Sequence, residues 1–575
     1  MKMTSHPKHK ESKEFIYPSS TSSAETEEES SRHEKLVAPG HTGATNITSR
    51  YKNIISKSTL KSSGHPVVYQ LRPKKEEFET LTRMTVGEKN LNRTNKTILL
   101  VGETGAGKST LINALFNYTM GVKWEDGVWF QIVEEKRAPI ENQTDSLTSD
   151  VIVYEIFDFE DRILPYSLTI IDTPGFGSTR ETKHDDIISQ RLRDLFQSEE
   201  GVYEVHAVGL VMIAAGNRLS DRLRYIFDSV MSLFGINMEK IIVALITHSD
   251  GKTPENALKA LEAANIKCAK NEKNEPVHFL FDNQQNTERT EENESVLEAA
   301  WRVSERGMGQ FTNFLKRSES QKLKKTAEVL NERIRLKACI QNLTERVELA
   351  EGKQTEIRQI QDALKKHEEE MKNNEKFTVE VDEVFNGKQP IDGGMWGLFF
   401  YQGAVCCKVC EENCHYPGCT KAWYPEHCQV IKDGHCSVCT GKCPPADHVK
   451  EKWIYVSKTR RVEKTVEEMK EKFEKNKSEC ENKSSLLEHL AEEMNQLRAE
   501  KKQFLDESYQ HVIKLEQIAL KADSASTIVH LEFLIEKMKE EGDREKVQKL
   551  EEMRSRVDER TRAALQDMFG KLFKK

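Results

Sequence analysis

The stretch Gly102–Thr110 reads GETGAGKST and decides the fold of the region around it. The apolar, β-prone run 97–101 precedes it, and an amphipathic helical pattern begins at Leu111. Strand, glycine-rich loop and helix, in this order, form the context of a phosphate-binding loop, whose glycines let backbone N–H groups turn toward phosphate oxygens. We expect the nucleotide to contact Gly102, Glu103, Thr104, Gly105, Ala106, Gly107, Lys108, Ser109 and Thr110.

Two side chains of this loop have expected roles in binding. Lys108 can place its ammonium group on the β- and γ-phosphates, and Ser109 can offer its hydroxyl to Mg²⁺. The N-terminus of the following helix adds a favourable field for an anion. A degenerate loop that has lost its ligand is the alternative, but a chance match with both flanks correct is rare.

A second motif follows another apolar run, 168–171, and reads Asp172-Thr173-Pro174-Gly175. In a P-loop NTPase, the carboxylate after this strand holds the water shell of Mg²⁺, and the glycine N–H can sense the γ-phosphate. The motif comes about sixty residues after Lys108 and directly behind a strand. We therefore interpret it as a switch loop rather than as an ordinary β-turn.

A third motif, Thr247-His248-Ser249-Asp250, ends the apolar run 241–246. A carboxylate here can accept two hydrogen bonds from guanine N1 and N2, which adenine cannot supply, so Asp250 is the expected guanine selector. His248 stands where many GTPases carry lysine, and it is either a flat group against the base or a plain surface histidine. Asn283, behind the run 277–281, is the candidate that closes the base pocket.

The first switch has a weaker signature. Thr144, Ser146 and Thr148 lie between the first helix and the β-prone run 150–156, and one of these hydroxyls should reach Mg²⁺ when GTP is bound. Thr148 is the preferred candidate because it lies closest to that strand.

Together, GETGAGKS, DTPG, THSD and the terminal DN resemble the septin-like branch of translation-factor-type GTPases, and particularly the immunity-associated GIMAP (AIG1-type) G domains. The resemblance covers about 95–315. It implies binding of GTP or GDP with Mg²⁺ held through Ser109, Thr148 and Asp172, and nucleotide-dependent pairing through the G face.

One residue departs from the Ras-like pattern. Phe176 follows the DxxG motif where Ras-like enzymes carry a glutamine that positions water, and a phenyl ring has no hydrogen-bonding group. Hydrolysis is therefore expected to be slow alone or to rely on a partner subunit, with Lys108, Thr148 and Gly175 as the residues that act on the phosphates.

The composition bounds the rest of the chain. Of 575 residues, 37% are hydrophobic and 31% are charged, which favours two to four domains with long solvated helices. The net charge of -8, from 86 basic and 94 acidic residues, does not indicate a nucleic-acid partner. The apolar runs are too short to cross a bilayer and no export signal is present, so we expect a cytoplasmic protein without a transmembrane segment.

The expected fold is an α/β P-loop NTPase G domain, with a mostly parallel sheet flanked by helices, followed by a long helical region that a small cysteine-rich module interrupts. The expected order is a disordered tail 1–65, a linker 66–94, the G domain 95–317, a helical or coiled-coil segment 318–380, a zinc module 381–455, a second helical segment 456–523 and C-terminal helices 524–575.

Heptad-like spacing predicts the helical segments. Leu336, Ile340, Leu343 and Val347 begin one seam, and Val462 begins another. The two helices suggest an antiparallel hairpin with the module at its tip, and an intermolecular coiled coil is the competing arrangement. The chain is expected to be a homo-oligomer through the G domain or the coiled coil, and its helical arm is expected to bind protein partners.

The module contains nine of the twelve cysteines. Two Cys-x-x-Cys pairs with further Cys and His residues, in a chain without an export signal, favour structural zinc over disulfides. Eight or more ligands suffice for two tetrahedral sites, and Cys406 beside Cys407 leaves the first ligand ambiguous. The zinc candidates are Cys407, Cys410, Cys414, His415, Cys419, Cys428, Cys436, Cys439, Cys443 and His448.

These features favour a GTP-binding switch or scaffold. One alternative is a zinc-dependent adaptor whose G domain binds nucleotide without hydrolysing it. A second is an ATPase of the SMC type, which also joins a phosphate loop to a hairpin coiled coil with a Cys-x-x-Cys tip. Chain order disfavours the second, because Asp172 precedes the coil and no Leu-Ser-Gly-Gly signature follows it.

Overall fold

The computed structural model describes residues 50–78, 81–90, 92–134, 150–157, 163–175, 182–215, 221–366, 378–391, 394–396, 400–419, 424–465 and 486–556. The helices and strands below all lie in one compact unit, Lys52–Lys575.

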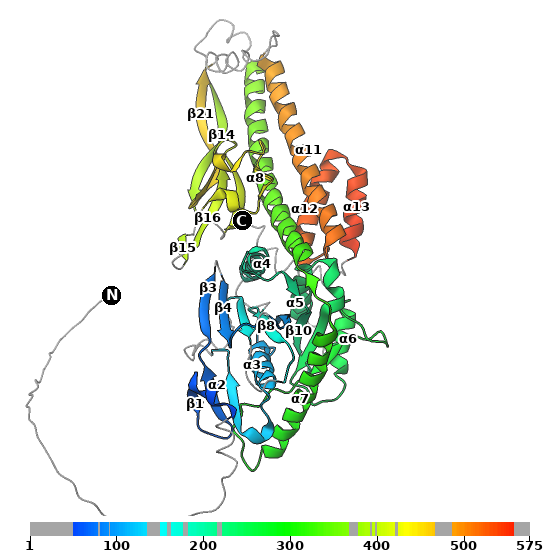
Figure 1. The fold of residues 1–575 in the computed structure, drawn as a ribbon. Coiled ribbons are helices and arrows are strands. Elements are labelled where there is room, and N and C mark those ends of the chain that lie inside the picture. Colours follow the sequence, from blue (N-terminus) through cyan, green and yellow to red (C-terminus); the bar gives the residue numbers. More distant parts are fainter. Residues whose placement is uncertain are drawn as a thin grey trace, which may run out of the picture. The chain divides into compact units, whose positions relative to one another are not determined.

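An eight-stranded mixed sheet forms the centre of the G domain (Figure 1). Its strands, in spatial order, are β12 (His278–Leu280), β11 (Ile242–Thr247), β10 (Ala207–Ile213), β5 (Asn95–Gly102), β8 (Ser167–Asp172), β7 (Ile152–Ile156), β4 (Leu81–Val86) and β3 (Lys74–Phe78). Neighbours from β12 to β8 are parallel, β4 is parallel to β7, and β7–β8 and β3–β4 are antiparallel. The prediction of a mostly parallel α/β sheet agrees with this pairing.

The central strands are short apolar runs because both faces of the sheet are covered. In β8 and β11 every residue is buried. On one face, Leu99 and Val101 belong to the same core as Leu192 of α4 (Thr182–Gln197) and Phe227 of α5 (Asp221–Ser232). The following helix, α6 (Glu255–Ala263), adds Leu261 to this core.

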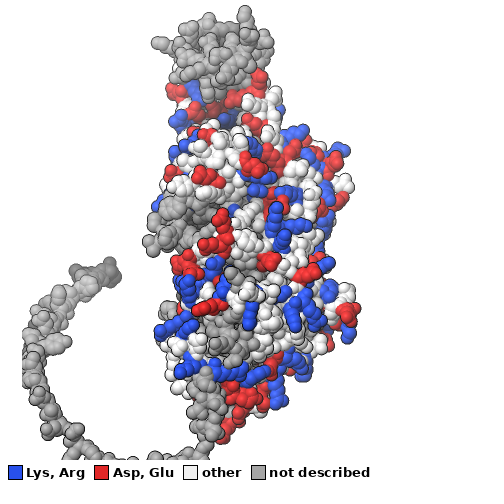
Figure 2. All heavy atoms as spheres, viewed as in Figure 1, with Lys and Arg blue, Asp and Glu red and all other residues white. Residues whose placement is uncertain are grey.

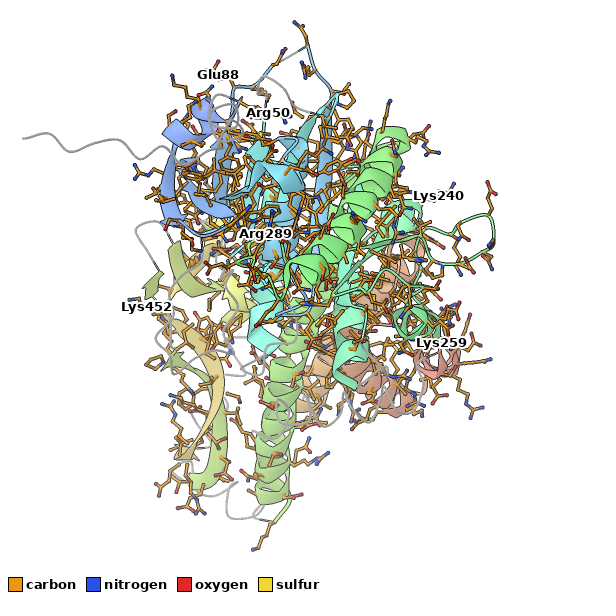
Figure 3. The ribbon with its side chains drawn as sticks, turned by 90° about the horizontal axis from the view of Figure 1, so that it is seen from below. Arg50, Glu88, Lys240, Lys259, Arg289 and Lys452 are labelled. Atoms are coloured by element: carbon orange, nitrogen blue, oxygen red, sulfur yellow. The ribbon has the colours of Figure 1, made fainter. Side chains whose placement is uncertain are left out.

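Two further helices belong to the G domain and pack against each other, α3 (Lys108–Thr119) and α7 (Glu294–Arg317). Phe279 of β12 packs against Phe311 of α7, with ring centroids 5.2 Å apart. Just before α7, the guanidinium of Arg289 lies 3.3 Å from the ring centroid of Trp124, in the short 3-10 turn Trp124–Asp126 (Figure 3). The contact between Arg289 and Trp124 holds the segment before α7 against the turn that follows α3.

The segment before the phosphate loop is more ordered than expected. It contains α2 (Lys52–Ser56), β1 (Ser58–Ser62) and β2 (Val67–Leu71), and β2 pairs in parallel with β6 (Val128–Gln131). The structure thus differs from the expected tail 1–65 and linker 66–94, because β1 pairs with β2 and β2 obtains a distant partner in β6.

Beyond the G domain, α8 (Lys324–Lys366) and α11 (Leu486–Ile518) form an antiparallel pair within one chain (Figure 1). Two ion pairs show that the helices run in opposite directions, Arg346–Glu500 at 2.7 Å and Glu332–Lys514 at 2.9 Å. Residue numbers rise from 332 to 346 along α8 while those of the paired residues fall from 514 to 500 along α11. The seam residues predicted on α8, Leu336, Ile340, Leu343 and Val347, are buried in the shared core. This pairing favours the expected hairpin of helices over an intermolecular coil.

Two shorter helices, α12 (Ala525–Glu541) and α13 (Arg544–Ser555), complete this core. They match the predicted C-terminal helices, and Gly542 between them has the positive φ of 78° that ends α12.

The largest difference from the sequence prediction is a two-stranded ribbon, β14 (Thr378–Pro390) and β21 (Trp453–Thr465), paired antiparallel. The predicted second helix includes 456–465, and Val462 was expected in its seam. The structure corrects both: these residues are a strand, and α11 begins at Leu486. The segment 453–465 is rich in aromatic and β-branched residues, so pairing with a strand of equal length outweighs its heptad spacing.

The cysteine-rich module lies beside α8 and not at the tip of a helical hairpin. Its strands are β15 (Gly394–Trp396), β16 (Phe400–Cys407), β17 (Glu412–Cys419), β18 (Ile431–Lys432), β19 (His435–Cys436) and β20 (His448–Glu451). Asn342 on α8 donates to the Asn413 carbonyl oxygen over 3.3 Å, and Arg346 lies 3.1 Å from Glu412. The expected position at the tip is therefore wrong: α8 carries a second contact face, formed by Ala338 and Cys339, that binds the module.

Positive and negative side chains are interspersed over the face shown in Figure 2. Among the helices that the structure describes, none is long and apolar enough to span a membrane.

Candidate functional site

The predicted phosphate loop connects β5 to α3 and has the backbone that its glycines imply. Gly102 and Gly107 have φ values of 152° and 88°, which L side chains rarely adopt. A Cβ at Gly102 would collide with the Val211 carbonyl oxygen, and one at Gly107 would lie 3.3 Å from Thr247. Both glycines are therefore required by the conformation of the loop.

Lys108 is the first residue of α3 and is only 7% exposed. Its ammonium group donates to the carbonyl oxygens of Gly102, over 3.0 Å, and Glu103, over 2.9 Å. Burial lowers the pKa of Lys108 to about 8, and the carboxylates of Asp172 and Glu103 oppose this shift. A buried cation under a loop of backbone N–H groups fits the phosphates of a nucleotide, because their negative charge would stabilise its protonated form.

The DTPG motif lies against this loop. Asp172 ends β8 beside β5 and is fully buried, and the Thr173 hydroxyl donates to the Leu100 carbonyl oxygen over 2.8 Å. A Cβ at Gly175 would overlap the backbone of Thr104, so the two loops are in contact. The Thr104 hydroxyl is buried there and makes no hydrogen bond within the described part of the chain.

The residues of the THSD motif differ in their environment: Thr247 is buried against the phosphate loop, whereas His248 and Asp250 are exposed. The Thr247 hydroxyl lies 2.8 Å from the Ala106 carbonyl oxygen, so it joins the end of β11 to the phosphate loop. His248 is exposed with a positive φ of 53°. The Asp250 carboxylate is exposed and held by Lys252, whose backbone N–H and ammonium group are each 3.0 Å away. These contacts lower the pKa of Asp250, so it is an anion at neutral pH.

Asn283 lies on a neighbouring loop, since the Ser249 N–H donates to the Phe281 carbonyl oxygen over 3.1 Å. The side-chain oxygen of Asn283 accepts a hydrogen bond from the Ser304 hydroxyl over 3.0 Å. Its amide nitrogen is buried and has no hydrogen-bond acceptor among the described residues. The pair of loops thus offers a carboxylate acceptor from Asp250 and an amide donor from Asn283.

The structure shows two further residues at this site that the sequence motifs did not predict: Lys252, which holds Asp250, and Ser304, which holds Asn283. The Asp-x-Lys spacing from 250 to 252 is a local signal that could have identified the first. Ser304 belongs to α7, and no local pattern connects it to Asn283. Thr144, Ser146, Thr148 and Phe176 lie outside the described residues, so their predicted roles remain predictions.

All ten predicted zinc ligands lie in clusters whose ligand atoms are within 4.8 Å of one another. The clusters are Cys407, Cys410, Cys439 and Cys443; Cys414, Cys436, Cys439 and His448; and His415, Cys419 and Cys428. The Cys406 thiol instead donates to Asn413 over 3.3 Å, outside the clusters. This assigns Cys407, and not its neighbour, to the ligand set.

Two local features of these clusters fit a metal ion. Backbone N–H groups donate to Sγ atoms, as from Cys410 to Cys407 over 3.3 Å and from Cys439 to Cys436 over 3.4 Å. His448 has its Nδ1 atom 2.9 Å from the Pro444 carbonyl oxygen, while its Nε2 atom is buried without a hydrogen bond in the described structure. The first contact fixes the tautomer that leaves Nε2 free to bind a metal.

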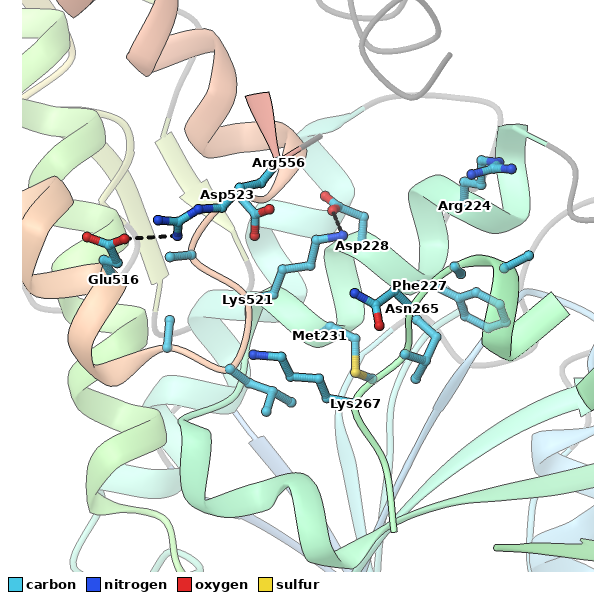
Figure 4. A pocket seen from close by; sticks show the side chains of 16 residues that line it. Arg224, Phe227, Asp228, Met231, Asn265, Lys267, Glu516, Lys521, Asp523 and Arg556 are labelled. Carbon is cyan, nitrogen blue, oxygen red and sulfur yellow. Dashed lines mark ion pairs between the residues drawn. The ribbon is translucent and has the colours of Figure 1, made fainter. Parts of the chain in front are cut away.

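A cavity of about 450 Å³ lies away from the phosphate loop, between α5 and the turn from α11 to α12 (Figure 4). Four of the charged side chains that line it form two ion pairs: Lys521 lies 2.7 Å from Asp228, and Arg556 lies 2.8 Å from Glu516. We interpret it as an ion-paired junction between the G domain and the C-terminal helices.

Comparisons with known proteins point to the same region as the phosphate loop. The Septin family model matches residues 92–207. Septin-9 of Rattus norvegicus is 39% identical over 80 residues, which are 14% of this chain and 12% of that protein. Septin-5 of Macaca fascicularis is 26% identical over 111 residues, which are 18% of this chain and 26% of that protein. The matches therefore span a small part of these relatives.

Among solved structures, Toc33 from Arabidopsis thaliana in complex with GDP and Mg²⁺ aligns with 40% of this chain and 87% of its own, at 14% identity and a TM-score of 0.28. The region 92–207 is therefore similar to septin G domains, and its sheet order and loop geometry are those of the P-loop GTPase fold.

Proposed function

We propose that this protein binds GTP and GDP with Mg²⁺ and acts as a slow or pairing-stimulated GTPase, in a switch or scaffold role. The observation that carries the proposal is the contact between the phosphate loop and the DTPG loop, with Lys108 buried beneath the first. The septin-like match over the same residues supports it. A narrower AIG1-type assignment rests on the motifs alone.

Different groups of the chain would bind the phosphates, the base and Mg²⁺. Backbone N–H groups of the loop and the Lys108 ammonium would bind the phosphates, and Asp250 would accept hydrogen bonds from guanine N1 and N2. The Asn283 amide could donate to a base oxygen or nitrogen. Ser109, Asp172 and Thr148 would hold Mg²⁺, which neutralises phosphate charge during transfer. The backbone N–H of Gly175 would sense the γ-phosphate, and the contact of Gly175 with Thr104 of the phosphate loop supports this role.

The first experiment measures nucleotide affinity by calorimetry with GTP, GDP and ATP. Wild type should bind the guanine nucleotides and discriminate against ATP, and Lys108→Ala should lose binding. Lys259→Ala is the matched control, because Lys259 is an exposed lysine on α6, paired with Glu255 (Figure 3). Equal affinity for ATP and GTP would contradict the proposal and would favour an ATPase.

Turnover separates the main proposal from its alternative. Release of phosphate that rises with protein concentration would support a GTPase stimulated by pairing of G domains. Nucleotide binding without any phosphate release would favour the zinc-dependent adaptor. Light scattering with a non-hydrolysable GTP analogue and with GDP tests the pairing, and a monomer in both states would count against it.

Binding of protein partners by the helical arm and a cytoplasmic location remain predictions.

We further propose that the cysteine-rich module binds structural zinc. Its ligand clusters are composed of protein side chains that are all buried except the half-buried Cys410, and their thiolates fit zinc. Metal analysis of the reduced protein should find zinc, and its absence would contradict this part of the proposal while leaving the nucleotide site untouched.

A further inference from the structure

We propose that the cysteine-rich module holds three metal ions, and that the third is bound by His415, Cys419 and Cys428 where the module contacts the helical arm. This deepens the proposed zinc binding, which expects two tetrahedral sites. The inference rests on how the candidate ligands are grouped in space.

The third cluster has the dimensions of a metal site. The Sγ atoms of Cys419 and Cys428 are 3.8 Å apart, and Nδ1 of His415 is 3.1 Å from Sγ of Cys428. Two thiolates that each lie about 2.3 Å from a tetrahedral zinc ion are about 3.8 Å apart. The same separation excludes a disulfide, whose sulfurs are about 2.05 Å apart. All three residues are buried, with exposures of 4% or less.

The third cluster is separate from the other two because of the strand that carries it. Cys414 and His415 are consecutive residues of β17, and consecutive side chains of a strand point to opposite faces. Cys414 therefore joins Cys436 and His448 on one side, while His415 joins Cys419 and Cys428 on the other. One ion cannot serve both sets.

The first two clusters are not independent, because Cys439 belongs to both. Its sulfur is within 4.8 Å of the ligand atoms of each set. No other described Cys, His, Asp or Glu completes either set without it. We assign Cys439 as a thiolate shared by two ions, each of which has three further ligands of its own.

The position of the third cluster gives it a structural role. Gln429, next to Cys428, accepts a hydrogen bond from Arg335 of α8 over 3.3 Å at its carbonyl oxygen. One turn away on α8, Asn331 accepts from Arg193 of α4 over 2.6 Å. Burial lowers the pKa of Arg193, and the nearby Asp194, Cys428 and Cys419 oppose that shift, so the two cysteines lie close to the guanidinium.

A metal ion here would fix the segment around Cys428 against α8, close to α4, the first described helix after the DTPG loop. On binding, the two thiols lose their protons and the imidazole binds through its neutral form. The charge of a divalent ion is balanced by two thiolates, so the site formed with these and the neutral imidazole has no net charge. The described part of the chain offers three ligands, and a water molecule would complete a tetrahedral shell.

Metal content per chain tests the proposal. The full chain, purified reduced and loaded with zinc chloride, should contain three equivalents of zinc. Cys419→Ser and Cys428→Ser should each retain two, Cys443→Ser should retain two, and Cys439→Ser should retain one. Cys406→Ser and Cys339→Ser are matched controls, because both are buried cysteines outside the clusters, and should retain three.

Cobalt titration of wild type provides a readout that needs no variant. Cobalt chloride added to the metal-free chain should saturate at three equivalents, and the site with two thiolates should contribute the weakest thiolate-to-cobalt absorption. Saturation at two equivalents, or unchanged zinc in Cys419→Ser and Cys428→Ser, would overturn the third site but leave structural zinc intact. Loss of one equivalent in Cys439→Ser would overturn the shared thiolate, and a chain without zinc would overturn both proposals.

Discussion

Arg333 on α8 donates from Nε to the carbonyl oxygen of Ser232, at the end of α5, over 2.8 Å. The same guanidinium donates to the hydroxyls of Ser524 and Thr527 and to the Lys521 carbonyl oxygen. This half-buried side chain thus links the G domain, the long helix and the turn from α11 to α12. Burial lowers its pKa to about 10, with Asp228 opposing, so it remains charged at neutral pH.

Replacing this arginine should weaken the whole junction. Arg333→Met leaves two carbonyl oxygens and two hydroxyls without their donor, and we expect a loss of roughly 3–5 kcal/mol in the free energy of unfolding. Urea unfolding followed by circular dichroism measures it. Arg302→Met, at an exposed arginine paired with Glu298 on α7, should change stability by less than about 0.5 kcal/mol. Equal stability of the two variants would contradict the proposed junction.

Nucleotide affinity should depend on the protonation of Lys108. Its pKa is about 8 in the free protein, and bound phosphate should raise it. Between pH 6 and 7 the group is already protonated, so it contributes no pH dependence. Above pH 8, binding must take up a proton, and affinity should fall by up to about tenfold per pH unit. Titrations with a fluorescent GDP analogue across this range measure the slope.

The variant Lys108→Arg provides the control for this pH dependence. Its guanidinium keeps its proton throughout the range, so any residual binding should not vary with pH through this position. A constant wild-type affinity from pH 7 to 9.5 would show that Lys108 does not titrate there.

Base selectivity should depend on Asp250. Asp250→Asn replaces one acceptor with a donor, which would face guanine N1–H and N2–H, and we expect GTP affinity to fall by about 100-fold. Xanthosine triphosphate, which carries an oxygen at C2, should bind the variant better than GTP does. Asp282→Asn is the matched control, since that carboxylate accepts from Gln284 instead. An unchanged preference for guanine in Asp250→Asn would remove Asp250 from the base site.

Removal of zinc should unfold the module while sparing the nucleotide site. The core of the module consists largely of cysteines, with Val405, Val430 and Val438 between them, so it has little apolar area to stabilise it without metal. The G domain has a separate core. A chelator should raise the reactivity of thiols toward Ellman's reagent and leave GDP affinity within about threefold. Unreactive thiols after chelation would indicate that metal does not hold this core.

Local patterns predicted the centre of the G domain well. The apolar runs 97–101, 168–171, 241–246 and 277–281 coincide with β5, β8, β11 and β12, because strands covered on both faces are apolar along their whole length. The first heptad residues of α8, Leu336, Ile340, Leu343 and Val347, are buried. The glycine loop is found where its flanks placed it, since its backbone conformation is a property of neighbouring residues.

The same patterns failed where a segment's conformation depends on a distant partner. The heptad spacing that includes Val462 suggests a helix, but pairing with Val381 makes it a strand. Val67–Leu71 carries no strong signal and becomes ordered beside Val128–Gln131, which lies far along the chain. In both cases, the energy that decides the structure comes from cross-strand contacts that local periodicity does not encode.

The sequence by itself determined the phosphate loop, the central strands and the ten candidate metal ligands, because each depends on residue type and local spacing. Only the tertiary structure decided that Gly175 meets Thr104, that Arg333 joins α5 to the arm, and that the ligands form three clusters. Those outcomes depend on which faces of strands and helices meet, and burial of surfaces far apart along the chain selects them.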